Sequence, residues 1–140
     1  MVTQIVATRE LPMASAAYAR AVGELGAVGD ARWIGWSEEL AHLAGPRWLK
    51  ANAPGVVPIL RSNHYPSVLA AAHAGLGIAV LPAPYLRTGL VAVAHRPELA
   101  PIWATLPSAE LWLVAHRALR NVPRVASVWG FLLTKLRTTP

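Results

Sequence analysis

Six residues with side chains suited to ligand binding follow three short apolar segments of this sequence. They are Trp36, Ser37, Ser62, Asn63, His64 and Pro82. In an open α/β sheet, the carboxyl ends of the strands and the helices that follow them share one crevice, where free helix amides attract anionic groups. A hydroxyl, an amide and an imidazole beside an aromatic wall can orient a small ligand there. We therefore expect these residues to bind a small carboxylate or aromatic acid.

A second interpretation of the same residues is purely structural. Ser37 and Asn63 can serve as helix caps and nothing more, because their side-chain oxygens accept hydrogen bonds from the free amides of a first helical turn. Trp36 is then a core residue and His64 an exposed one. The sequence leaves both interpretations open.

Motifs for catalysis, metal binding or nucleotide binding are incomplete. Glu39 and His42 have the spacing of a carboxylate-bridged metal site, but the second copy that such a site needs is missing. Ser37 follows Gly35 as in a nucleophile elbow, but Glu39 stands where that motif has glycine. The single aspartate, Asp30, and the dispersed histidines form no acid–base pair. Since glycine-rich phosphate-binding motifs are also missing, we expect no enzyme activity, no metal and no cofactor.

Composition indicates a folded protein outside the membrane. Hydrophobic residues make up 54% and charged residues 14%, which excludes disorder and predicts more apolar surface than 140 residues can bury, so we expect a partner. The net charge of +6 comes from 13 scattered basic residues, which permit contact with nucleic acid without indicating it. Cysteine is absent, and no segment has the roughly 20 apolar residues of a membrane span or the pattern of a secretion signal. We expect a cytoplasmic, single-domain protein.

The candidate binding residues need strands and helices to bring them together, and the apolar pattern predicts these in alternation. The first half of the chain should contain a strand over residues 2–9, a helix over 14–22 ended by Gly23, a strand over 32–36, a helix over 38–43 capped by Ser37, and a helix over 47–52. A βαβ crossover should follow, with a strand over 56–61, a helix over 64–74 capped by Asn63, and a strand over 78–81. Both of its strands are apolar on successive residues, as is typical of parallel strands covered on both faces.

The last part of the chain is richer in proline. It should contain a strand over residues 90–94, a loop over 97–107, a strand over 110–116 and a final helix capped by Asn121. That helix carries one apolar stripe, made of Val125, Trp129, Leu132 and Leu136. Spacings of three and four place these side chains on one face, which should pack on a core.

The order and spacing of these segments resemble the effector-binding domain of LysR-type transcriptional regulators. The signature runs from Arg61-Ser62-Asn63 through Leu69-Ala70-Ala71-Ala72 to Ala74-Gly75-Leu76-Gly77-Ile78-Ala79-Val80-Leu81-Pro82. Upstream, Ala14-Ser15-Ala16-Ala17-Tyr18 resembles the start of the family's short helix, and Trp33-Ile34-Gly35-Trp36 the strand that follows. Downstream, residues 110–116 and 123–136 resemble the family's closing strand and helix.

The resemblance implies an α/β fold like that of type II periplasmic binding proteins, in which the effector binds between two subdomains. On this alignment the chain lacks the family's winged helix-turn-helix and the first part of subdomain one. Residues 14–120 then correspond to subdomain two, and residues 121–136 to a C-terminal helix that packs toward subdomain one or a partner. By position, the family's cleft-facing residues correspond to Trp36, Ser37, Asn63, His64 and Pro82.

The implied function is effector sensing for a transcription regulator that contacts DNA only through the missing winged helix-turn-helix. We expect a homodimer or higher homo-oligomer. The alternative is a stand-alone interaction fragment that pairs with intact regulators through its last helix. Two departures from the family pattern, Ala16 in place of proline and the unusual His64-Tyr65-Pro66, prevent transfer of an effector from relatives.

Overall fold

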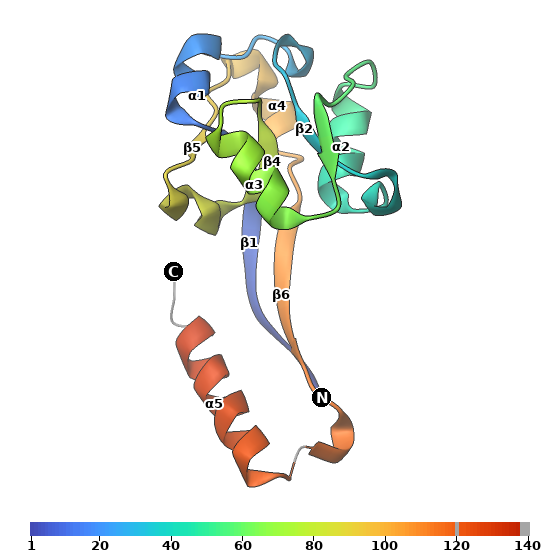
Figure 1. Cartoon of the computed structure of the whole chain (residues 1–140), viewed down its shortest axis with the longest axis vertical. Helices are drawn as coiled ribbons and strands as arrows, with labels where there is room; N and C mark the ends of the chain where they lie inside the picture. Colours follow the sequence, from blue (N-terminus) through green and yellow to red (C-terminus); the bar gives the residue numbers. More distant parts are fainter. Residues whose placement is uncertain (120, 138–140) are drawn as a thin grey trace. The chain divides into compact units, whose positions relative to one another are not determined.

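The computed structural model of the chain describes residues 1–119 and 121–137 and divides them into two compact units. The larger unit holds residues 9–107, and the smaller unit combines residues 1–8 with the chain from residue 108 onward. Strand β1 (Val2–Ala14) contributes to both units, whereas every other described strand and helix belongs to one of them (Figure 1).

The larger unit is built on strands that are neighbours in the order β3, β2, β4, β1, β5. Their bounds are β2 (Ile34–Trp36), β3 (Leu60–Ser62), β4 (Ala79–Pro82) and β5 (Val91–Ala92). β1 is antiparallel to β4 and β5, while β2 is parallel to β3. A parallel bridge between Trp33 and Ile78 joins the two groups of strands. The predicted crossover from β3 to β4 is therefore confirmed, with β2 lying between its two strands.

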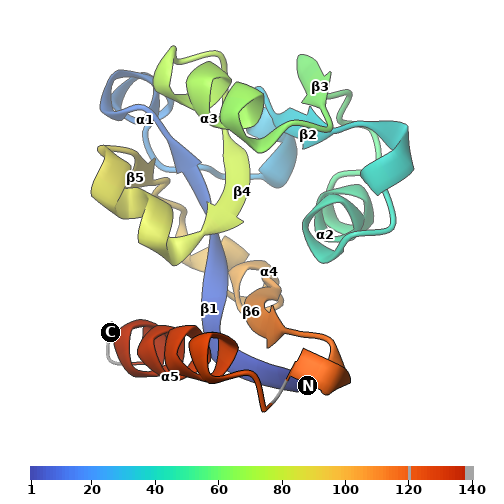
Figure 2. The same cartoon turned by 60° about the horizontal axis from the view of Figure 1, so that its bottom comes forward.

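Four α-helices and four 3-10 helices complete the larger unit. They are α1 (Ala16–Val22), α2 (Ala44–Asn52), α3 (Tyr65–His73) and α4 (Ala100–Trp103), with 3-10 helices at Val28–Asp30, Glu38–Leu40, Ala83–Thr88 and Pro97–Leu99. α1 begins after Ser15, whose Oγ accepts a hydrogen bond from the backbone amide of Tyr18 at 3.2 Å. It ends as predicted at Gly23, whose φ of 68° favours glycine. Figure 2 shows β2 between α2 and α3.

Two apolar clusters form the core of the larger unit. In one, the ring of Trp48 lies 6.2 Å from that of Trp33 and 5.7 Å from that of Trp103. Trp33 is 1% exposed, and its indole N–H donates to the carbonyl of Val28 at 2.7 Å. In the other, α3 contributes the buried Val68 against Leu81 and its neighbours in the sheet. Burial of each large apolar side chain stabilises the folded state by about 1.5–3 kcal/mol. The two clusters therefore stabilise the positions of β2 and β4, whose ends carry the candidate residues.

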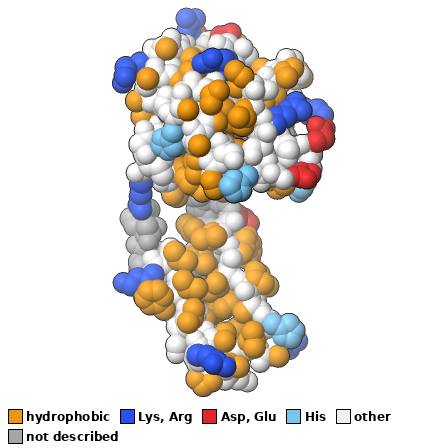
Figure 3. Space-filling model, in the orientation of Figure 1, with side chains coloured by type: hydrophobic (Ala, Val, Ile, Leu, Met, Phe, Trp, Pro, Cys, Tyr) orange, Lys and Arg blue, Asp and Glu red, His pale blue; other side chains and the backbone are white. Residues whose placement is uncertain are grey.

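The smaller unit exposes several large apolar side chains. It contains the start of β1, β6 (Ser108–Val114), a 3-10 helix (Arg117–Leu119) and α5 (Pro123–Arg137). The predicted stripe of α5 is half-buried, whereas Val128 and Phe131 on other faces are 58% and 60% exposed. On β6, Leu111, Trp112 and Val114 are also exposed. Figure 3 shows apolar side chains gathered on this unit.

Several predicted boundaries are wrong, mostly in short elements. The strand predicted over 56–61 is confined to Leu60–Ser62, because Pro58 has no amide for a strand ladder. The strand predicted over 90–94 covers only Val91–Ala92. The predicted loop over 97–107 contains a 3-10 helix and α4, both of which have proline in the first turn, where its missing amide costs little.

Two helix predictions also need correction. The helix predicted over 38–43 is only the 3-10 helix Glu38–Leu40, and α2 begins at Ala44 rather than at residue 47. The last helix begins at Pro123, two residues after Asn121, so the predicted cap at Asn121 is wrong. None of the described helices is long and apolar enough to cross a membrane.

Candidate functional site

The structure brings together five of the six predicted binding residues at the ends of β2 and β3. Trp36 and Ser62 are the last residues of these two parallel strands and lie directly opposite each other. The amide of Ser37 donates to the carbonyl of Ser62 at 3.2 Å. This hydrogen bond holds the segments that follow β2 and β3 side by side. We call Trp36, Ser37, Ser62, Asn63 and His64 the strand-end cluster.

Hydrogen bonds within the chain engage most polar groups of the strand-end cluster. The hydroxyl of Ser37 donates to Oε1 of Glu39 at 3.3 Å, and the side-chain amide of Asn63 donates to the same oxygen. The backbone amide of His64 donates to Oγ of Ser62 at 3.0 Å. Glu39 therefore links the two loops, and any ligand that takes hydrogen bonds from Ser37 and Asn63 has to compete with its carboxylate.

The predicted cap at Asn63 is wrong, and the predicted cap at Ser37 is right in position only. Ser37 precedes a 3-10 helix and makes no side-chain capping bond, because its hydroxyl turns to Glu39. The N-cap of α3 is His64, one residue after Asn63. The helix itself offers few amides to an anion, since Pro66 has none and the amide of Ser67 donates to the carbonyl of His64 at 3.0 Å. Side chains, more than free helix amides, are therefore the groups that can bind an anion at these strand ends.

A row of aromatic rings extends from the strand-end cluster. Trp36 and Tyr65 have ring centroids 4.7 Å apart, and Tyr65 stacks on Tyr85 at 5.5 Å with an interplanar angle of 22°. Pro82, the sixth predicted residue, ends β4 and precedes the 3-10 helix that carries Tyr85. The two tyrosines were not among the predicted binding residues, although the unusual Tyr65-Pro66 at the start of α3 was a signal.

Glu10 is a further residue at the site, and no sequence motif singled it out. It lies opposite Pro82 in the pairing of β1 with β4. Its Oε2 is buried without a hydrogen-bond partner among the described residues, and burial raises the pKa of its carboxyl. The pKa of Tyr65 is also raised, mainly by burial and further by the nearby Tyr85 and Glu10. A lone glutamate in a strand carries no motif, so only the fold reveals this position.

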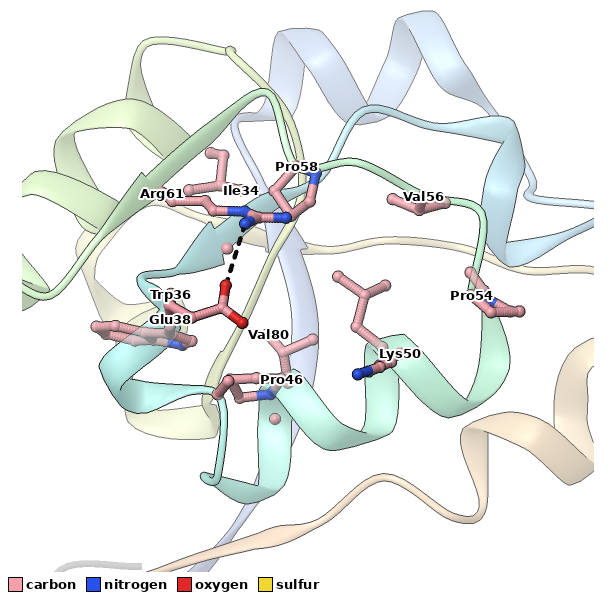
Figure 4. A pocket seen from close by; sticks show the side chains of 15 residues that line it. Ile34, Trp36, Glu38, Pro46, Lys50, Pro54, Val56, Pro58, Arg61 and Val80 are labelled. Carbon is pink, nitrogen blue, oxygen red and sulfur yellow. Dashed lines mark ion pairs between the residues drawn. The ribbon is translucent and has the colours of Figure 1, made fainter.

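A pocket of about 220 Å³ lies between α2 and the strands β2 and β3 (Figure 4). Of the six predicted residues only Trp36 lines it. Charged side chains at the pocket are Glu38, Lys50 and Arg61, and the guanidinium of Arg61 lies 3.5 Å from the carboxylate of Glu38. The pocket therefore adjoins the strand-end cluster but is formed mainly by other residues.

The site has no evident metal-binding group. Among residues 1–119 and 121–137, no set of three histidine or acidic side chains could hold a metal ion. The Glu39 and His42 pair considered from the sequence lies in the short turn after β2, where Glu39 is engaged with Ser37 and Asn63.

Comparisons with known proteins agree on the kind of domain. The family model described as "LysR substrate binding domain" matches residues 3–137. No curated protein sequence matches the chain.

Solved structures with this fold include regulators from two bacteria. The regulatory domain of CrgA, a LysR-type transcriptional regulator from Neisseria meningitidis, has a TM-score of 0.70 and 15% identity over 97% of this chain and 68% of that domain. A second CrgA structure gives 0.72 and 16%, over 97% of this chain and 47% of CrgA. DarR from Vibrio fischeri in complex with DNA gives 0.62 and 19%, over 95% of this chain and 44% of DarR. The chain thus spans less than half of the CrgA and DarR chains in the last two structures.

Proposed function

Since the chain belongs to the family of LysR substrate binding domains, we propose that it senses a small-molecule effector on behalf of a DNA-binding transcription regulator. The observation that carries this proposal is the strand-end cluster. In it, polar and aromatic residues meet at the carboxyl ends of the two parallel strands β2 and β3. Ligands of open α/β folds bind at such edges. In this proposal, residues 9–107 are the effector-binding subdomain.

The effector in this proposal is a small carboxylate or an aromatic acid. Trp36, Ser37, Ser62, Asn63, His64 and Pro82 are its proposed contacts. Ser37 and Asn63 supply hydrogen-bond donors that already bind one carboxylate, that of Glu39, so their geometry suits a carboxylate group. The ring of Trp36 supplies an apolar wall.

Effector binding acts in this proposal by shifting a conformational equilibrium. A ligand that prefers one arrangement of the domain raises the population of that arrangement, and a DNA-binding part of the regulator responds to it. One related regulator, DarR, has been solved in complex with DNA. We assign the chain no catalytic role and place it in the cytoplasm as part of a homo-oligomer.

Thermal unfolding with a panel of small carboxylates and aromatic acids tests the proposal. A ligand that binds the folded state raises the melting temperature by mass action. We expect at least one acid to give a saturable rise that is reduced in Asn63→Ala and in Trp36→Ala. The matched control is Asn52→Ala, which changes the same residue type in α2, outside the strand-end cluster. Absence of any rise in a cooperatively unfolding chain contradicts effector binding by this chain.

The exposed apolar side chains of the smaller unit support a second candidate function. Val2, Leu111, Trp112, Val114, Val128 and Phe131 are each more than 45% exposed. Exposed apolar patches are typical of protein interfaces, and Figure 3 shows apolar side chains gathered on this unit. The second candidate is therefore a protein-interaction fragment that pairs with intact regulators. Co-purification with a full-length LysR-type regulator, lost in Phe131→Asp, would support it, whereas a monodisperse monomer that responds to an acid would count against it.

A further inference from the structure

All residues that line the pocket between α2 and the sheet belong to the larger unit. Its walls come from β2, β3, β4, the turn after β2, α2 and the segment between α2 and β3. Ile34, Leu49 and Val80 in these walls are each less than 10% exposed. A pocket complete within one unit can bind a ligand without a second subdomain.

Size and lining favour an aromatic or branched apolar group. The wall residues include three prolines, Pro46, Pro54 and Pro58, together with Leu49 and Val56. A dry apolar cavity of roughly 150 Å³ is large enough to hold benzene. The pocket's volume of about 220 Å³ therefore accommodates one ring with a small substituent.

The charges at the pocket favour an anionic substituent. Lys50 lies on the α2 side of the pocket in Figure 4, and its ammonium group has no ion-pair partner among the described residues. Arg61 faces Glu38 on another side, where the 3.5 Å ion pair is largely exposed and can rearrange at little cost. A carboxylate bound in the pocket thus has Lys50 as an unpaired cation, and Arg61 as a second cation among the lining residues.

We propose that this pocket is a second small-molecule site, separate from the strand-end cluster, and that it takes a small aromatic or branched apolar monocarboxylate with the apolar group between α2 and β2 and the carboxylate at Lys50. This proposal does not depend on the binding of an effector at the strand-end cluster. Because Trp36 lines both places, occupation of the pocket also alters one wall of the strand-end cluster.

Benzoate and its neutral counterpart benzyl alcohol are suitable probes for this site. Binding to the whole chain is followed by calorimetry and by amide chemical shifts. We expect saturable binding of benzoate that is at least tenfold tighter than binding of benzyl alcohol, because the carboxylate gains a charge-assisted contact with Lys50. Shifts are expected at Lys50 and Ala53 on the pocket walls.

Three variants and one matched control separate the site from its surroundings. Lys50→Met keeps the apolar stem and should weaken benzoate binding about tenfold, without weakening benzyl alcohol. Arg20→Met removes a cation that is also exposed, from the last turn of α1, and should leave the binding of both probes unchanged. Ala41→Trp, at an exposed position on the pocket wall, should block both probes. Asn63→Ala serves to locate benzoate, because it removes a donor of the strand-end cluster and no group that lines the pocket.

Four results overturn the proposal. Equal affinity for benzoate and benzyl alcohol would show that Lys50 does not bind the carboxylate. Equal effects of Lys50→Met and Arg20→Met on benzoate affinity would show the same. No benzoate binding by a cooperatively folded chain removes the site itself. Loss of benzoate binding in Asn63→Ala with retention in Lys50→Met places the acid at the strand-end cluster, which overturns this proposal while supporting the proposed function.

Discussion

The side-chain amide of Asn63 donates a hydrogen bond to the carboxylate of Glu39, which lies 24 residues earlier in the chain. The hydroxyl of Ser37 donates to the same carboxylate oxygen at 3.3 Å. Glu39 therefore occupies, within the protein, the donors that we propose for the carboxylate of an effector. An acid that binds at the strand-end cluster must displace this internal carboxylate or share its donors.

Glu39→Gln should tighten the binding of an acid at the strand-end cluster. The change removes a negative charge that repels the ligand, worth about 1 kcal/mol at roughly 4 Å in water, or about fivefold in Kd. Calorimetry with the acid that gives the largest thermal shift measures the effect. Glu24→Gln, which makes the same charge change in an exposed loop, is the control, and equal effects of the two variants would contradict the competition.

Glu10→Met should remove a pH-dependent loss of stability. Burial raises the pKa of the Glu10 carboxyl above its ordinary value of 4.5, so the unfolded chain ionises first as the pH rises. The folded chain therefore binds more protons in that window and loses stability until its own carboxyl ionises. Tyr65, which contacts this region, has a raised pKa and stays neutral there.

Denaturant unfolding between about pH 4 and about pH 8 measures this effect. We expect the free energy of unfolding of the wild type to fall relative to that of Glu10→Met as the pH rises. Glu24→Met serves as the control for removal of an exposed carboxylate. Curves for wild type and Glu10→Met that stay parallel over this range would contradict the burial of an ionisable Glu10.

Gly77→Ala should destabilise the fold although it adds a single methyl group. A Cβ at residue 77 would lie 2.6 Å from the backbone carbonyl oxygen of Arg32, which also accepts the amide of Ile78 at 2.8 Å. Backbone atoms cannot move aside without disturbing the link between β2 and β4, so we expect a loss of about 1–3 kcal/mol. Gly55→Ala meets nothing within 4 Å and should cost well under that. Denaturant unfolding measures the stability of both variants. Equal losses of stability would contradict the close approach of residue 77 to the carbonyl of Arg32.

Trp33→Ala should be among the most destabilising single changes. The ring is 1% exposed and packs on Trp48, and its indole N–H bonds to Val28. Loss of a buried aromatic ring costs about 3–5 kcal/mol. Trp112→Ala removes the same ring from a position that is 46% exposed and should cost far less. A small effect of Trp33→Ala on thermal unfolding would contradict the core described for the larger unit.

The sequence predicts the order of elements better than their ends. The β3–α3–β4 crossover was predicted because its apolar run, its glycine and its cap-like residues all agree, and the family signature runs through it. The short elements were misjudged where proline and tertiary contacts decide, as at Pro58 and in α4. Local patterns carry little information on elements of two to four residues, because packing rather than propensity stabilises them.

Part of the candidate site was predictable, and part was not. Trp36, Ser37, Ser62 and Asn63 follow recognisable strands, and parallel pairing necessarily brings such residues to one edge. The hydrogen-bond partner of Ser37 and Asn63 is Glu39, which the sequence placed in a helix over residues 38–43 that is only a 3-10 turn. Glu10 and the stacking of Tyr65 on Tyr85 depend on contacts between distant segments, for which no local pattern exists.

Amide chemical-shift mapping of the bound acid tests the central claim, that the strand-end cluster binds a small-molecule effector, most directly. The whole chain is titrated with the acid that gives the largest thermal shift. Our account predicts saturable shifts at Ser37, Asn63 and His64 that disappear in Asn63→Ala. Shifts that spare these three residues and lie elsewhere, or no shifts at saturating acid, would contradict it.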